Sequence, residues 1–124
     1  MTDKISNMDA RRLFLYLHGL SDLKDREREN HDLPKMINKI GFVQIDSIKT
    51  VERAHHHILF SRHRSYKREW LKKHLEDDRT LFENWTHDAS IIPMTFFPYW
   101  RVRFDRAKEK ISRSKWWLKR IGKI

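Results

Sequence analysis

The sequence predicts a mainly α-helical fold with a small β component, ending in a long basic helix. Apolar residues recur at spacings of three and four along most of the chain, as they do on the buried face of an amphipathic helix. The short stretch 42–47 alternates in polarity instead, which is typical of a strand. Residues 95–124 hold ten Lys and Arg residues against two acidic ones, a net charge of +8. These patterns predict helices around a small sheet, with the positive charge concentrated toward the end of the chain.

Length and composition restrict the class of protein. A chain of 124 residues is long enough for one compact domain and short for two. It has no Cys, which excludes disulfide bonds and thiolate metal sites. The start, MTDKISNMDARR, is charged where a secretory signal would be apolar, and no apolar run reaches membrane-spanning length. We expect a soluble cytoplasmic protein.

The net charge of the chain is +10, and it is unevenly distributed. The first 94 residues carry only +2. A basic excess of this size favours a polyanion such as nucleic acid as a partner, because each neutralised phosphate releases counterions. The same charges are also compatible with a solvated helix face, so charge alone leaves both alternatives open.

The first predicted element is a helix capped by Ser6 or Asn7 and ending near Gly19. Its apolar residues fall at helical spacing, which predicts one buried face. They are Ala10, Leu13, Phe14, Leu17 and Leu20. The charged stretch that follows, residues 21–32, has no large apolar residue except Leu23 and is predicted to be an exposed loop.

A second helix is predicted after this loop. Asp32 can cap it, Pro34 suits its first turn, and Gly41 is a stop signal. Its apolar face consists of Met36, Ile37 and Ile40. A strand over residues 42–47 follows directly.

Two more helices and a β segment complete the first part of the chain. Residues 51–62 and 66–75 each place apolar side chains at helical spacing. Residues 80–93 are rich in apolar side chains without that period, which favours a strand or hairpin. This order of elements is typical of a winged-helix (helix-turn-helix) DNA-binding domain, which we predict for residues 1–93.

The last predicted element, within residues 94–124, is one long basic amphipathic helix. Pro93 and Pro98 bracket its entry. Its apolar stripe consists of Phe97, Trp100, Phe104, Ala107, Ile111, Leu118 and Ile121. Because nothing downstream covers this stripe, we expect the helix to dock on more protein than the chain contains.

Gln44 and Asp46 are the most informative polar pair in the sequence. In a strand, successive side chains point to opposite faces, so these two share one face while Val43 and Ile45 are buried on the other. An amide and a carboxylate side by side can hold a water molecule. The alternative is structural, with Asp46 or Ser47 serving only to cap the next helix.

At these residues the chain resembles a known family, the bacterial DNA glycosylases of the YcaQ/AlkZ type. The motifs that carry the resemblance are Val43-Gln44-Ile45-Asp46, Arg53-Ala54-His55-His56, Phe60-Ser61-Arg62, Trp85-Thr86-His87-Asp88-Ala89-Ser90 and Ile92-Pro93. It spans about residues 8–105, and members of the family are much longer. The resemblance therefore implies the N-terminal portion of a bacterial, nucleoid-associated DNA repair enzyme, with C-terminal domains missing here as its partners.

The resemblance implies that Gln44 and Asp46 are catalytic, in hydrolysis of the N-glycosylic bond of alkylated purines and unhooking of interstrand crosslinks. This reaction passes through an oxocarbenium-like sugar, which needs negative charge beside it and a positioned water. An N7-alkylated purine already carries positive charge and leaves without a separate acid. Asp46 would then activate the water and stabilise the sugar cation, while Gln44 fixes the water by hydrogen bonds.

The remaining candidate residues are expected to contact double-stranded DNA. They are Arg53, His55, His56, Arg62, His87, Arg101 and Arg103. No two of the eight His residues are four positions apart, so the helical ligand pair of a metal site is absent and we expect neither metal nor cofactor. For the segment around His87, a strand whose polar residues satisfy one another remains an alternative to a DNA contact. For the whole chain, the alternative function is a non-catalytic winged-helix DNA-binding module or transcriptional regulator.

Overall fold

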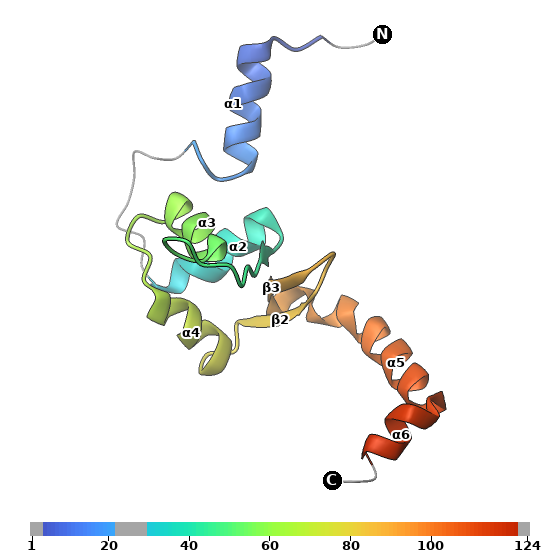
Figure 1. Cartoon of the computed structure of the whole chain (residues 1–124). Coiled ribbons are helices and arrows are strands. Elements are labelled where there is room, and N and C mark those ends of the chain that lie inside the picture. The colour runs from blue at the N-terminus through green and yellow to red at the C-terminus, as the bar shows by residue number, and fades with distance from the viewer. Residues whose placement is uncertain (1–3, 22–29, 122–124) are drawn as a thin grey trace. The chain divides into compact units, whose positions relative to one another are not determined.

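The structure is a computed structural model that describes residues 4–21 and 30–121 (Figure 1). Backbone contacts divide the chain into two compact units, Met1–Met94 and Thr95–Ile124. None of the described helices is long and apolar enough to cross a membrane. The first unit contains helices and one small sheet, and the second contains helices.

The described part of the first unit holds four α-helices and three strands. The helices are α1 (Asn7–Leu17), α2 (Leu33–Ile40), α3 (Ala54–Arg62) and α4 (Arg68–Glu76). The strands are β1 (Val43–Gln44), β2 (Leu81–Trp85) and β3 (Ala89–Pro93), in the antiparallel order β1-β3-β2. The mainly α-helical fold with a small β component is therefore confirmed.

Helix α1 begins where the sequence predicts and is exposed where the sequence predicts burial. The Ser6 hydroxyl accepts a hydrogen bond from the Asp9 backbone N–H at 3.1 Å, which is an N-cap. No residue of the helix is buried, and Phe14 is 58% exposed. The predicted buried face is wrong, because helical spacing makes a face apolar but only a second surface packed on it can bury it. The loop predicted next lies mostly on residues 22–29, outside the described residues.

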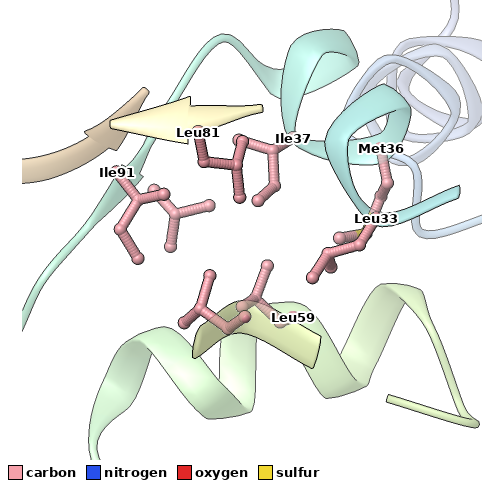
Figure 2. Close-up of a cluster of buried hydrophobic side chains, with 8 residues drawn as sticks. Leu33, Met36, Ile37, Leu59, Leu81 and Ile91 are labelled. Atoms are coloured by element: carbon pink, nitrogen blue, oxygen red, sulfur yellow. The ribbon is translucent and has the colours of Figure 1, made fainter. Parts of the chain in front are cut away.

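Helix α2 supplies one side of the core. Gly41 ends it with a φ of 90°, as its stop signal predicts, but the Asp32 side chain makes no capping hydrogen bond because a 3₁₀ turn, η1 (Asn30–Asp32), precedes the helix. In Figure 2 the α2 side chains of the core point toward Leu59 of α3 and toward the sheet. The buried cluster is Leu33, Met36, Ile37, Val43, Leu59, Leu71, Leu81 and Ile91.

Strand β1 is shorter than predicted, and the two helices after it begin later. The strand covers Val43 and Gln44, although the Ile45 N–H still donates to the Ala89 carbonyl oxygen at 2.8 Å. Helix α3 starts at Ala54 rather than residue 51, because residues 50–52 form a bend that is closed by an isolated antiparallel bridge between Lys49 and Arg53. Helix α4 likewise starts at residue 68 rather than 66.

The predicted β segment at 80–93 is a hairpin. Strands β2 and β3 pair antiparallel, with Trp85 opposite Ala89, so residues 86–88 form the connecting turn. Strand β3 also pairs with β1, with Val43 opposite Ile91 and Gln44 opposite Ser90. Strand β3 is thus the central strand, and its register with β1 places the hairpin turn beside the end of β1.

The described part of the second unit contains two α-helices where the sequence predicts one. They are α5 (Phe97–Arg113) and α6 (Lys115–Ile121). Ser114 between them is extended, and its hydroxyl lies 3.5 Å from the Trp117 backbone N–H, in the position of an N-cap for α6. Along the predicted stripe Phe97 is 38% exposed. Leu118 and Ile121 lie outside the residues whose side chains are described.

Candidate active site at the end of β1

Gln44 is the last residue of β1, and the hairpin turn holds its side chain on two sides. The amide Nε2 donates a hydrogen bond to Asp88 Oδ2 at 3.2 Å. The amide oxygen Oε1 lies 3.3 Å from His87 Nε2, which donates to it. The Gln44 side chain is otherwise exposed, so its remaining hydrogen-bonding capacity faces solvent.

The turn that holds Gln44 is itself fixed by hydrogen bonds. The Thr86 N–H donates to the Asp88 carbonyl oxygen at 3.0 Å. The second carboxylate oxygen of Asp88, Oδ1, accepts from the Ala89 N–H at 2.7 Å. The polar residues of this segment therefore satisfy one another, as the structural alternative for the segment around His87 anticipated, and they also reach Gln44.

Asp46 lies two residues beyond Gln44, after the strand has ended. Its carboxylate oxygen Oδ1 accepts from the Ile48 backbone N–H at 2.8 Å, a local turn contact that redirects the side chain. The expectation that one strand carries both Gln44 and Asp46 is corrected, since the strand ends at Gln44. The N-cap position of α3 belongs to Arg53, so neither Asp46 nor Ser47 caps that helix.

His55 connects helix α3 to the backbone of Asp46. Its Nδ1 lies 3.4 Å from the Asp46 backbone N–H and accepts from it, which requires a neutral imidazole with the proton on Nε2. The residue is 5% exposed. The pKa of His55 is lowered from 6.5 to about 4, chiefly by burial and to a smaller extent by the positive charges of His56 and Arg53.

A second polar group lies beside His55. His56 Nδ1 lies 2.7 Å from the hydroxyl of Tyr66, and burial lowers the pKa of His56 and raises that of Tyr66. Glu52 accepts from the Arg53 N–H at 2.9 Å and forms an ion pair with Arg68 at 2.8 Å. The Arg53 hydrogen bond is the main cause of the lowered pKa of Glu52.

His55, His56 and Arg68 border a cavity between the sheet and the helices α3 and α4. Its volume is about 350 Å³, and its lining includes Ile45, Arg53, His55 and His56. Antiparallel pairing places Gln44 on the opposite face of β1 from Ile45. The sequence did not single out Tyr66, Glu52 or Arg68 as part of this site, because their contacts join separate elements and follow no regular spacing.

The other predicted DNA contacts are spread over the chain. Arg53 is exposed at the start of α3, and His87 is exposed in the hairpin turn. Arg62 is half-buried, and its guanidinium donates to the carbonyl oxygens of His18 at 2.8 Å and Ile58 at 3.0 Å. Burial lowers the pKa of Arg62.

Arg101 and Arg103 belong to α5 in the second unit, and both are exposed. The Arg103 guanidinium lies 5.7 Å from the centre of the Trp100 ring. The first unit thus brings together Gln44 and His87, and separately Asp46, Arg53, His55 and His56, while Arg62 is engaged within the protein.

The comparison with known families decides the identity. The family model described as DNA glycosylase AlkZ-like matches residues 37–123, which include Gln44, Asp46, the hairpin and helix α5. The chain belongs to this family. No solved structure matches the chain. The resemblance seen in the sequence is confirmed, and the family is one of DNA glycosylases, enzymes that act on DNA.

Proposed function

We propose that this AlkZ-like chain hydrolyses the N-glycosylic bond of N7-alkylated purines in double-stranded DNA, including purines joined in interstrand crosslinks. The observation that carries the proposal is the placement of an oriented amide, Gln44, two residues from a carboxylate, Asp46, inside the segment that the family model matches. Both groups lie at the end of β1.

The chemistry follows from the two side chains. Breaking an N-glycosylic bond builds positive charge on the sugar, and a nearby carboxylate stabilises that charge and accepts a proton from the attacking water. Asp46 supplies the carboxylate. One of its oxygens is occupied by the Ile48 N–H, and among the described residues no hydrogen bond ends on the other, which is thus available to a water. Gln44 fixes the same water through its free amide valences.

The base itself needs no protein acid in this proposal. An N7-alkylated purine carries a positive charge before the bond breaks and departs as a neutral base. Gln44 and Asp46 therefore suffice for the reaction. Because the pair carries only the single negative charge of Asp46, its activity is restricted to substrates whose base leaves readily. Ordinary purines are poor substrates for this reason.

DNA binding is proposed for both units. In the first, residues 1–93, the order α2-β1-α3-α4-β2-β3 with the sheet order β1-β3-β2 supports a winged-helix domain that presents the site to the duplex. In the second, residues 94–124, the net charge of +8 over 95–124 supports phosphate contacts, to which Arg101 and Arg103 contribute. Arg53, His56 and His87 are proposed as the contacts of the first unit, whereas His55 is buried and Arg62 is held by backbone carbonyl oxygens, so neither is proposed to reach DNA directly.

The test is release of N7-methylguanine from duplex DNA by Asp46→Asn. This variant keeps the shape of the side chain and removes its charge, so the rate of release should fall by about 10²–10³, the usual cost of losing one group that stabilises developing charge. Asp77→Asn is the matched control, because Asp77 is an exposed carboxylate at the end of α4. Full activity of a folded Asp46→Asn protein would rule out the proposed mechanism. Duplex binding without any release by the wild type would favour the alternative, a non-catalytic winged-helix module.

A further inference from the structure

We propose that His87 and Asp88 are positioning residues that determine which way the Gln44 amide faces. The proposal rests on the proposed function, in which Gln44 orients the attacking water. Neither residue touches the reacting atoms here; both act through Gln44. The hairpin turn between β2 and β3 is then part of the catalytic apparatus.

Asp88 selects one of the two orientations of the amide. A carboxylate only accepts hydrogen bonds, so Asp88 Oδ2 must face the Nε2 of Gln44. Rotating the amide by half a turn would place its oxygen against the carboxylate oxygen, two acceptors in repulsive contact. His87 reinforces the choice, because its Nε2–H needs an acceptor and finds the amide oxygen at 3.3 Å.

This arrangement leaves one hydrogen-bond donor and one hydrogen-bond acceptor of the Gln44 amide unused. A primary amide has two N–H groups and two oxygen lone pairs. Asp88 takes one N–H and His87 takes one lone pair, so one donor and one acceptor remain, each at a fixed place. A water that accepts from the remaining N–H and donates to the remaining lone pair is held in one orientation. An amide can orient a nucleophile in this way.

The turn holds both positioning side chains in place. Asp88 is anchored by Oδ1 to the Ala89 N–H at 2.7 Å. The His87 ring packs edge-on against Phe42, with ring centres 5.7 Å apart, and its Nδ1 lies 3.3 Å from the Thr86 hydroxyl. Because the Gln44 amide oxygen can only accept, this placement requires the His87 tautomer with the proton on Nε2.

The variant Asp88→Asn tests the proposal most sharply. It is isosteric, and its side-chain oxygen can still accept from the Ala89 N–H. The amide nitrogen that it introduces then faces Gln44 Nε2, a contact between two donors. We expect Gln44 to rotate and His87 to move its proton to Nδ1. Imidazole ¹⁵N shifts should report the Nε2–H tautomer of His87 in the wild type and the Nδ1–H tautomer in the variant.

Activity provides the second measurement. Asp88→Asn should slow single-turnover release of N7-methylguanine about tenfold, the effect of one misdirected hydrogen bond, without weakening duplex binding. In a Gln44→Ala background the same change should have no further effect, because Asp88 acts only through Gln44. At saturating protein, where a contribution of His87 to DNA binding does not enter the rate, His87→Leu should slow release in the wild-type background and have no further effect in Gln44→Ala, and His87→Gln, which keeps a donor, should restore most of the rate.

The controls separate this inference from the proposed function. If Asp46→Asn keeps full activity, the proposed function is wrong whatever Asp88 does. If Asp46→Asn loses activity and Asp88→Asn still slows release equally with and without Gln44, the positioning role is wrong. An unchanged His87 tautomer in Asp88→Asn would also overturn it. Asp77→Asn should leave both the tautomer and the rate unchanged.

Discussion

His55 is predicted to make the fold sensitive to mild acid. Its side chain is buried, and its pKa lies at about 4 instead of 6.5, chiefly because burial disfavours the charged imidazole. As the pH falls from 6.5 toward 4, the unfolded chain takes up a proton at His55 that the folded chain does not. The free energy of unfolding therefore has its full value above that window and decreases as acid is added.

The two pKa values set the size of this loss. Between pH 7 and pH 5 the contribution of His55 to the free energy of unfolding should fall by about 2 kcal/mol. Protonation also removes the acceptor for the Asp46 N–H, so the end of β1 should loosen in the same range. Urea unfolding at the two pH values measures the change.

Variants isolate the His55 contribution from that of other titrating groups. His55→Gln does not titrate, so it should lose about 2 kcal/mol less than the wild type between pH 7 and pH 5. Leu59→Val is the control, because it weakens the core and keeps His55; its stability should follow the wild-type pH dependence at a lower level. Equal losses in the wild type and His55→Gln would refute the assignment.

Two further predictions concern the core and the DNA-binding residues. Leu59→Ala should lower the free energy of unfolding by about 2–5 kcal/mol because Leu59 is fully buried. Phe60→Ala should lower it far less because Phe60 is 55% exposed. Chemical denaturation measures both changes, and a similar loss for the two variants would contradict the packing described. The affinity for duplex DNA, measured by fluorescence anisotropy, should fall steeply as the salt concentration rises. Replacing Arg101 and Arg103 by Gln should reduce the slope of log K against log salt by about 1 for each phosphate that the protein no longer neutralises. An unchanged slope would place these residues away from the phosphates.

The parts of the fold that the sequence predicted well are set by local chemistry. Ser6 caps α1, Gly41 ends α2 with its positive φ, and the apolar run before Pro93 forms a hairpin, each through contacts within a few residues. Ser114 shows the limit of such reasoning. The apolar stripe continues past it, but its hydroxyl is placed to cap a new helix, and periodicity alone does not distinguish one helix from two.

The candidate site depends on contacts that spacing cannot reveal. The motif located Gln44 and Asp46, but Gln44 meets Asp88 across 44 positions through the register of β1 and β3. Asp46 meets His55 only because the segment between them bends back on itself, closed by the bridge between Lys49 and Arg53. The exposure of α1 could not be predicted from the sequence either, because burial depends on the surface that packs on a helix and not on the helix itself.

The most direct test of the central claim is whether the protein releases a free alkylated base. Duplex DNA with a single N7-methylguanine would be incubated with the protein in the presence of a chelator, and the products would be identified by mass spectrometry. We expect intact N7-methylguanine and an abasic strand, formed faster than by spontaneous depurination and much faster than with Asp46→Asn. Release no faster than the spontaneous rate, under conditions where the duplex is fully bound, would contradict the assignment of Gln44 and Asp46 as a hydrolytic pair.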